Sequence, residues 1–392
     1  MKLYAKITIV LLAGVISFLT ACSPTEQYLR KRNIKLAEEL KDVRVLLLKT
    51  KDTVTISCES KVRGKEIKSE RVVLDKSNVS LKFRPDNVEN SIILESWDQP
   101  IAVNNMQYRG LIEIHNSLGV LHVINVVSMN DYLKGVVPSE IPALWPEEAL
   151  KAQAVAARTF CYYHIAKGNP NVLYNLDAST NSQVYKGVSV EKPTTSKAVE
   201  ETAGIIITEG SQPIIAYFHS TCGGRTADDQ TVWSGDGHDY LKGITCKFCG
   251  DSPHSSWESE LSLADITKTL QTKYNSIDKI TNISFAKKDG RVVEVKITYS
   301  NGSVRLKGND FRLMFPSQTI KSLYFTSEKK GKGLLLKGHG WGHGVGMCQW
   351  GAKGMADAGF AYKNIISHYY KNIRLVKISL GSNKMTANNS LN

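Results

Sequence analysis

The chain has 392 residues, of which 42% are hydrophobic and 22% are charged, a balance typical of a globular protein of one large or two ordinary domains. This composition excludes a wholly disordered chain. Lysine and arginine outnumber aspartate and glutamate by 50 to 37, and the net charge of +13 favours an anionic partner such as nucleic acid, acidic lipid or an acidic polymer.

The N-terminal residues predict export. A short basic segment, MKLYAK, precedes an apolar run from Ile7 to Phe18 that is too short for a mature membrane span, which indicates a signal peptide over residues 1–21. The segment LTACS resembles the lipobox of bacterial lipoproteins, in which Cys22 becomes the lipidated first residue. An ordinary signal peptide with a chance cysteine is the alternative. We therefore expect an exported, membrane-anchored lipoprotein of the bacterial envelope, extracytoplasmic or periplasmic, with no nucleic-acid partner.

The next two segments differ sharply in pattern. Residues 22–41 are polar and charged, and they are interpreted as a tether between membrane and domain. Residues 42–120 hold short β-rich runs broken by polar residues, which predict a β-rich N-terminal lobe. We expect a mixed α+β protein in which this lobe joins a catalytic core over residues 121–378.

Strands and helices alternate in the predicted core. GVLHVINVVSM (119–129) predicts a strand that leads into a loop, and a helix is expected from Pro146 to just before Gly168. Strands are expected at 204–210 and 212–224, and a closing helix at 361–372. An α/β insertion over about 258–332 contains a predicted helix at 261–274 and a hairpin turning at Asn301-Gly302. Residues 379–392 predict a loose tail.

The helix predicted after Pro146 is apolar nearly all round, so it should be buried. Lys151 and Arg158 fall within about 20° of each other on its helical wheel. Because buried charges need partners, two interpretations stay open. The two cations pair with structural groups, or they line a groove that receives an anionic ligand.

Glu140 stands between two prolines, in the segment VVPSEIPALW. A glutamate in a loop is usually solvated, but apolar neighbours raise the pKa of a carboxyl group toward the range of a general acid. The prolines also stiffen the backbone. The segment therefore predicts a positioned proton donor.

The stretch KGHGWGHGVGMCQWG has glycine at 338, 340, 342, 344 and 346. In an extended conformation, His339, Trp341 and His343 would share one face, which suits sugar binding because Trp stacks on sugars and His bonds hydroxyls. Metal binding by the two histidines is the alternative.

Cys222, Cys246 and Cys249 stand in HSTCGG and TCKFCG, and the last two form a Cys-x2-Cys pair. With His254 or His219 they could form a structural zinc site. A disulfide is the competing interpretation in an exported protein, and buried free thiols are the third.

Three long blocks make the chain resemble the SpoIID/LytB family, which includes stage II sporulation protein D and LytB-type amidase enhancers. The blocks are NDYLKGVVPSEIPALWPEEALKAQAVAARTF, AYFHSTCGGRTADDQTVW with YLKGI after it, and GHGWGHGVGMCQWGAKGMADAGFAYKNIISHYY. With the weaker β region, the resemblance spans about residues 42–378. Some relatives carry a metal-binding His/Cys set before a Gln-x-Tyr motif, but this chain has Ser182 before Gln183 and no such set there.

The resemblance implies a lytic transglycosylase that cuts peptidoglycan glycan strands, preferentially those stripped of stem peptides by an amidase, with no cofactor for catalysis. It implies that Glu140 is the catalytic residue and that Lys151 and Arg158 matter for activity. Gln153, Ser220 and Gln349 are further candidate groove residues. The alternatives are a glycan-binding enhancer of a cell-wall amidase, which cuts nothing, and a zinc-dependent envelope hydrolase.

Overall fold

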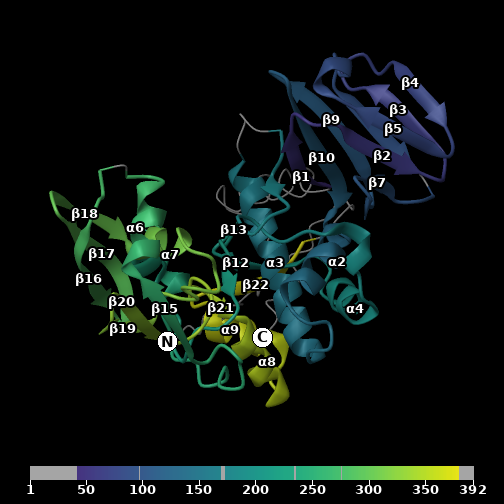
Figure 1. Ribbon diagram of the computed structural model, residues 1–392. Coiled ribbons are helices and arrows are strands. Elements are labelled where there is room, and N and C mark those ends of the chain that lie inside the picture. The colour runs from purple at the N-terminus through teal and green to yellow at the C-terminus, as the bar shows by residue number, and fades with distance from the viewer. Residues whose placement is uncertain (1–41, 97, 169–172, 234, 275, 379–392) are drawn as a thin grey trace, which may run out of the picture.

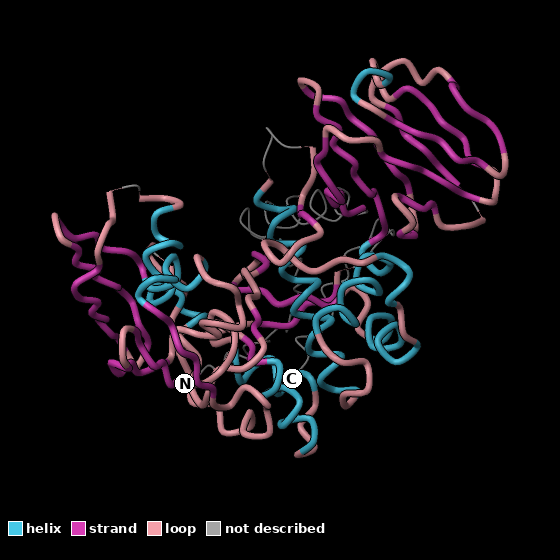
Figure 2. Tube along the Cα trace, in the orientation of Figure 1, coloured by secondary structure: helices cyan, strands magenta, loops and turns pink. Residues whose placement is uncertain are grey.

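The computed structural model describes residues 42–378, apart from 97, 169–172, 234 and 275. Within this range the protein has the expected mixed α+β fold (Figure 2). The predicted signal peptide, Cys22, the tether and the tail lie outside the described residues. None of the helices in the described range combines the length and the apolar character that crossing a membrane would require.

Two β-sheets form the N-terminal lobe (Figure 1). The larger has the strand order β11-β1-β10-β9-β6-β3-β4, and the smaller has the order β5-β2-β7-β8. The strands are β1 (Asp42–Thr50), β2 (Val54–Cys58), β3 (Val62–Glu66), β4 (Val72–Lys76), β5 (Val79–Phe83), β6 (Ile92–Ser96), β7 (Ile101–Val103), β8 (Met106–Tyr108), β9 (Leu111–Ser117), β10 (Val120–Ser128) and β11 (Leu176–Asp177). A 3-10 turn, η1, spans Pro85–Asn87. Alternating buried residues in β2 and β10 place one face of each sheet on the core.

A helical core follows β10 in the chain and lies between the N-terminal lobe and a third lobe (Figure 1). Its helices are α2 (Met129–Glu140), α3 (Glu147–Lys167), α4 (Pro193–Glu201), α5 (Asp229–Val232), α8 (Gln349–Asp357) and α9 (Tyr362–Tyr369), with 3-10 turns η2 (Gly187–Val190) and η3 (Asp239–Leu241). Its strands are β12 (Ile205–Glu209), β13 (Gln212–Pro213), β14 (Phe218–His219), β21 (Met347–Cys348) and β22 (Arg374–Lys377). The strand expected over 212–224 is thus two short pieces.

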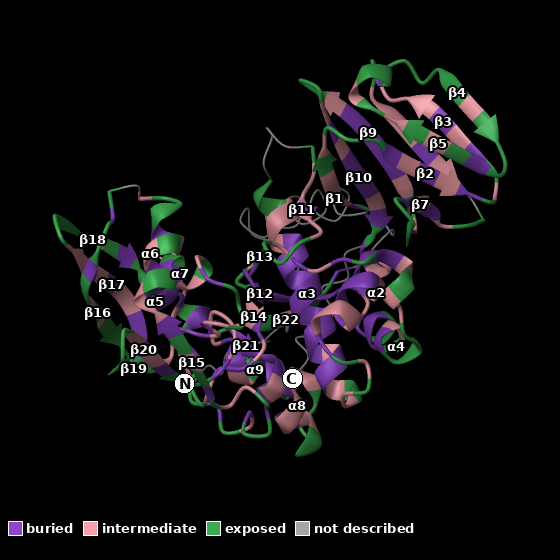
Figure 3. Ribbon diagram, in the orientation of Figure 1, coloured by how far each residue is buried: buried purple, intermediate pink, exposed green. Residues whose placement is uncertain are grey.

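Helix α3 is the centre of this core and is buried along most of its length (Figure 3). It begins after Pro146, and its first turn carries Glu147 and Glu148. Their negative charges stabilise the helix by interacting with the positive end of its dipole. Its small apolar residues allow α2, α4, α8, α9 and β12 to pack closely around it. One continuous hydrophobic core joins these helices to the N-terminal sheets.

The third lobe has a hydrophobic core of its own, formed by buried residues between Trp257 and Leu336. It contains β15 (Trp257–Ser262), α6 (Leu263–Gln271), β16 (Ile280–Lys288), β17 (Arg291–Tyr299), β18 (Gly302–Lys307), α7 (Gly308–Leu313), β19 (Phe325–Lys330) and β20 (Gly333–Gly338). The hairpin predicted here turns at Ser300 and Asn301, one residue earlier than expected, because Tyr299 pairs with Gly302. Trp257 pairs with Gly338, so the chain enters and leaves this lobe at one place.

Candidate active site

Glu140 is the last residue of helix α2, whereas the sequence analysis expected it in a loop. Ser128 starts the helix by accepting a hydrogen bond from the N–H of Asp131. Pro138 lacks an N–H and so removes one backbone hydrogen bond to the preceding turn, and the helix ends two residues later, with Ile141 as its C-cap. The carboxylate is therefore held by a helix that is packed against α3.

Two groups hold the carboxyl group of Glu140. Its Oε1 accepts a hydrogen bond of 3.0 Å from the N–H of Val184, and the Gln349 side chain, at the start of α8, also bonds to it. Burial raises the pKa of Glu140 above its ordinary value, and these two bonds oppose the rise. The negative end of the α2 dipole acts in the same direction as burial. The arrangement favours a carboxyl group that can hold a proton.

Gln153 stands behind this pair. It is 1% exposed, and its Oε1 accepts a long hydrogen bond of 3.4 Å from Nε2 of Gln349. Glu140, Gln349 and Gln153, three residues that the sequence nominated separately, are thus linked in one network.

A cavity of about 250 Å³ opens beside Glu140. Its other lining residues are Phe160, Thr180, Asn181, Ser182, Val184, Tyr217, Phe218, Trp233 and His343. Hollows of about 380 and 400 Å³ lie elsewhere in the molecule, but neither contains Glu140 or its partners. Aromatic rings with a few polar groups are a typical lining for a sugar site.

His343 forms part of the cavity wall, with its ring centroid 5.1 Å from that of Trp233. Its Nε2 donates to the carbonyl oxygen of Phe218, and its Nδ1 accepts from the N–H of Val345. Burial, helped by the positive charge of Arg312, lowers the pKa of His343 to about 3. The ring is neutral with both nitrogens occupied, so it offers a surface and no acid or base.

The other residues of the glycine-rich stretch do not share a face with His343. Gly340, Gly342, Gly344 and Gly346 all have positive φ, so this segment is not the extended strand that the sequence analysis assumed. His339 is exposed and bonds to the carbonyl oxygen of Ser255, and Trp341 packs edge-on against His254. Neither lines the cavity beside Glu140.

Lys151 is engaged with three glutamates. Its Nζ lies 2.6 Å from Glu147, 3.2 Å from Glu148 and 2.8 Å from Glu201. The ammonium group is therefore neutralised on the outside of α3, and Lys151 is absent from the cavity lining. The sequence left two roles open for Lys151, pairing with structural groups or binding an anionic ligand. Its three ion pairs correspond to the first role.

Arg158 is fully buried and bonds to backbone oxygens instead of a ligand. Its Nη2 donates to the carbonyl oxygen of Val199, and its Nη1 donates to Thr202 Oγ1 and to the carbonyl oxygen of Ile205. Burial lowers the pKa of Arg158 to about 10. The side chain ties α3 to α4 and β12, and it does not reach the cavity.

Ser220 is also absent from the cavity lining. Its carbonyl oxygen accepts a hydrogen bond from the N–H of Trp350. The sequence analysis did not identify most of the residues that line the cavity beside Glu140, nor the backbone N–H of Val184 that bonds to Glu140. The residues Phe160 and Trp233 stand inside the blocks AARTF and QTVW, but nothing in their spacing indicates that they meet.

The loop before Gln183 forms one side of the cavity. Asp177 accepts bonds from the N–H and hydroxyl of Ser179 and from the hydroxyl of Ser182, which fixes the turn. Gln183 is buried, accepts from the hydroxyl of Tyr132 and donates to the carbonyl oxygen of Ala157. Side-chain bonds therefore shape this wall of the cavity.

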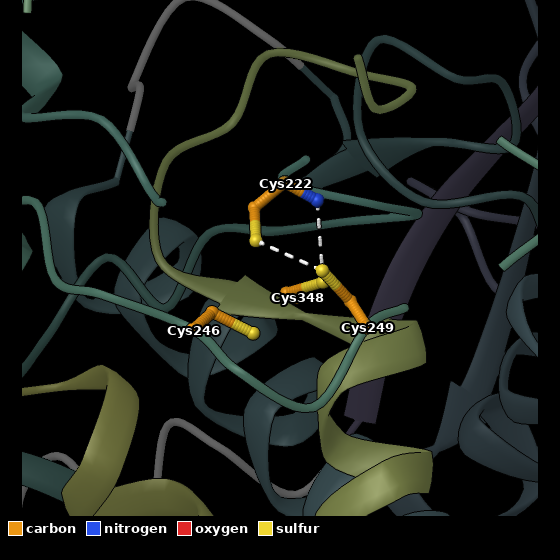
Figure 4. A group of neighbouring side chains, drawn as sticks. All are labelled: Cys222, Cys246, Cys249 and Cys348. Atoms are coloured by element: carbon orange, nitrogen blue, oxygen red, sulfur yellow. Dashed lines mark hydrogen bonds between the residues drawn. The ribbon is translucent and has the colours of Figure 1, made fainter. Parts of the chain in front are cut away.

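Four cysteines meet beside the glycine-rich stretch. The Sγ atoms of Cys222, Cys246, Cys249 and Cys348 all lie within 4.8 Å of one another, and all four residues are buried (Figure 4). The predicted fourth ligand, His254, is replaced by Cys348, because the His254 ring packs against Trp341. A tetrahedral zinc–thiolate site separates its sulfurs by about 3.8 Å, so the cluster is compatible with a structural metal.

Hydrogen-bond donors surround these sulfurs. The N–H groups of Cys222 and Gly351 lie 3.2 and 3.3 Å from Sγ of Cys348, which caps the N-terminus of α8. The hydroxyl of Tyr369 lies 3.2 Å from Sγ of Cys246. Such donors and a helix N-terminus stabilise thiolates more than thiols.

Comparisons with known proteins point in one direction. A family model described as stage II sporulation protein, SpoIID, matches residues 117–208, and one described as a domain of unknown function, DUF8618, matches residues 250–346. A stage II sporulation protein D of Bacillus amyloliquefaciens is 31% identical over 266 residues, which are 64% of this chain and 75% of that protein. An amidase enhancer of Bacillus subtilis is 31% identical over 74% of this chain but 46% of its own length. An uncharacterised protein of Brachyspira hyodysenteriae is 33% identical over 79% of this chain and 83% of its own.

Proposed function

Because the chain belongs to the SpoIID family, we propose that it is a peptidoglycan lytic transglycosylase with Glu140 as its single general acid and base. The observation that carries this proposal is the cavity beside Glu140. Glu140 is the one carboxylate among the described residues that line it, and burial raises its pKa. Ordinary glycosidases require two carboxylates across the scissile bond.

A single carboxyl group is sufficient when the substrate supplies the nucleophile. Protonated Glu140 gives its proton to the oxygen that bridges C1 of N-acetylmuramic acid and the next N-acetylglucosamine, and the C1–O bond breaks. The 6-hydroxyl of the same muramic residue attacks C1, and its proton passes to the Glu140 carboxylate. The products are a 1,6-anhydromuramic end and a free N-acetylglucosamine hydroxyl. The intramolecular attack needs no bound water.

An adjacent hollow of about 170 Å³ extends the site for a strand. Tyr217 and Trp233 line both hollows, so two sugars could lie on either side of this pair. The carboxylate of Asp229 in the second hollow bonds to His238 and to the N–H of Gln230. Its oxygens are therefore engaged, which supports Glu140 as the reacting group.

Recognition of stripped strands needs a cation near the cavity, because loss of the stem peptide exposes the lactyl carboxylate of each muramic residue. Lys151 and Arg158 are engaged elsewhere. The positive charge of Arg312 in α7 helps to lower the pKa of His343 in the cavity wall, and its Nε donates to the neutral side chain of Asn309. We assign this role to Arg312, and the net charge of +13 favours the same polyanion.

The four-cysteine cluster is proposed to hold zinc in a structural role. Four protein sulfurs fill a tetrahedral shell and leave no position for a substrate or water, which argues against the zinc-hydrolase alternative. The ion would fix Cys222 and Cys348, and so the two segments that carry Phe218 and His343 to the cavity and Gln349 to Glu140. Bound zinc would also protect the thiols from oxidation outside the cytoplasm.

The chain is further proposed to act on the outer side of a membrane, anchored through Cys22, with a cell-wall amidase as a functional partner. The amidase-enhancer relative favours a second candidate, a protein that binds glycan and stimulates an amidase without cutting. That candidate requires the cavity but no titrating carboxylate.

Mass spectrometry of glycan strands tests the proposal. The full chain in detergent, its Glu140→Gln variant and the exposed control Glu258→Gln are each incubated with strands that carry or lack stem peptides. We expect 1,6-anhydromuramic ends from the unchanged protein and the control, mainly with stripped strands, and a loss of at least about 100-fold in Glu140→Gln. Equal cleavage by Glu140→Gln would refute the assignment. Binding and amidase stimulation without cleavage by any of the three would establish the enhancer function instead.

A further inference from the structure

Arg291 is a buried cation at the start of strand β17 in the third lobe. It is 2% exposed, and its Nη2 donates to the carbonyl oxygens of Cys222 and Arg225 at 2.8 and 2.7 Å. Its guanidinium lies over the ring of Tyr324, 5.2 Å from the centroid. The hydrogen bonds of Arg291 within the described residues go to carbonyl oxygens and to no carboxylate, and its Nη1 is buried without a hydrogen-bond partner.

A guanidinium keeps its proton in a protein, so Arg291 brings a full positive charge into the interior. Carbonyl oxygens satisfy some of its N–H groups, but they supply no net negative charge. Burying a charge without a counter-charge is strongly unfavourable. An anion close to Arg291 would offset this cost, and no described carboxylate pairs with it.

The four-cysteine cluster is the group that can carry this negative charge. Cys222 belongs to it, and the carbonyl oxygen of Cys222 is bonded to Arg291. Four thiolates with one divalent ion have a net charge of about −2. As four thiols or as two disulfides the same cluster would be neutral, and Arg291 would remain uncompensated.

We propose that Arg291 is the counter-charge of a zinc–tetrathiolate centre, so that the third lobe completes a metal site whose ligands all come from the helical core. The inference rests on the zinc proposed above and assigns a role to a lobe that matches a family of unknown function. Arg291 is a positioning residue here, since it touches no ligand sulfur in the hydrogen bonds of the structure.

Close packing keeps the guanidinium at this place. Gly344 has φ of +85°, and a Cβ added to it would stand 2.7 Å from Cζ of Arg291. The segment from His343 to Cys348 therefore fits against the charged group without an intervening side chain. Packing and charge could both explain the burial of Arg291, and the experiment must separate them.

Three variants of the full chain, purified in detergent, make this separation. Arg291→Met removes the charge, Arg291→Lys keeps it, and Tyr324→Leu removes the ring beneath the guanidinium while leaving the charge in place. Circular dichroism first establishes that each variant is folded. Metal content by plasma mass spectrometry and competition with a chromogenic chelator then give stoichiometry and affinity, and cobalt substitution gives the sulfur-to-metal charge-transfer band.

We expect one zinc per unchanged chain, and affinity in Arg291→Met roughly 10–100-fold lower, with Arg291→Lys and Tyr324→Leu close to the unchanged protein. Loss of the positive charge should also move the cobalt charge-transfer band to longer wavelength only in Arg291→Met. A folded Arg291→Met protein with unchanged zinc affinity and an unchanged cobalt band would refute the counter-charge role of Arg291 but not the zinc site. An unchanged protein with no metal and two disulfides would overturn both.

Discussion

Glu140 is subject to two opposing influences. Burial at the end of α2 favours its neutral form, and donors from Val184 and Gln349 favour its charged form. A residue that first gives and then receives a proton benefits from this balance, because neither protonation state is too stable. Gln349 is therefore a tuning residue for the proposed reaction.

Gln349→Met is expected to change the pH profile of the proposed strand cleavage. Loss of the amide donor raises the pKa of Glu140 further, since the bond stabilises the carboxylate. Cleavage requires protonated Glu140, and it falls as pH rises through this pKa. The alkaline limb of kcat/KM should thus move to higher pH by about one unit. Gln153→Met, which removes an acceptor from Gln349 but no bond to Glu140, should shift it less. An alkaline limb that stays in place or moves to lower pH would contradict this role.

The sequence alone predicts part of the site around Glu140. The apolar neighbours of Glu140 predict its raised pKa because desolvation acts whatever the exact contacts are. Gln349 as a donor to Glu140 could not be predicted, since the two residues are far apart in the chain and meet only through the packing of α8 on α3. The helical wheel gave the common direction of Lys151 and Arg158. It did not give their partners on other elements, Glu201 of α4 for Lys151 and Ile205 of β12 for Arg158.

At the scale of elements, Arg158 is a brace between α3, α4 and β12. It donates to the buried carbonyl oxygens of Val199 and Ile205 and to the hydroxyl oxygen of Thr202. This explains why a helix of mostly small apolar residues retains a fully buried arginine.

Arg158→Leu is expected to lower the free energy of unfolding by about 3 kcal/mol, because several buried acceptors lose their donor. The kcat/KM of the protein that remains folded should change little. Urea unfolding beside the strand-cleavage assay checks both quantities. Lys151→Gln, in a partly exposed ion-pair network, should cost about 1 kcal/mol or less. Lost activity at unchanged stability in Arg158→Leu would instead restore the interpretation as a groove residue.

The glycine-rich stretch shows where period-two reasoning fails. Alternation of glycine with larger residues predicts a shared face only if every residue is extended. Four of these glycines adopt positive φ, which turns His339, Trp341 and His343 in different directions. Helix α3, by contrast, was predicted to within about one residue at each end, because Pro146 and Gly168 are local signals that tertiary contacts did not override.

For the whole molecule, the α+β class followed from the spacing of short apolar runs, whereas the way the parts join did not. The fourth cysteine of the cluster comes from the far side of the third lobe in sequence, so no local spacing reveals it. In the sequence, Cys348 stood out only as part of a block shared with the family. His254 lies nearer to the Cys-x2-Cys pair in the chain and was therefore predicted as the fourth ligand.

Chelation should separate structure from chemistry in the intact protein. Brief EDTA treatment is expected to leave strand cleavage unchanged, because no step of the proposed reaction at Glu140 uses a metal and the cluster is buried. Prolonged chelation in moderate urea should remove the ion and lower the unfolding midpoint, since metal binding is coupled to the folded state. Immediate loss of cleavage that added zinc restores would assign the metal to the reaction itself.

The pairing of Trp257 with Gly338 has a consequence for inheritance. The chain leaves the core for the third lobe and returns to it at one point. A single genetic insertion or deletion could therefore add or remove the lobe without changing the fold of the core segments on either side. A descendant that lost the lobe would also lose Arg291, and its four cysteines would then hold a charge with no compensation. Across related genomes, the lobe and the cysteines are therefore expected to be gained and lost together.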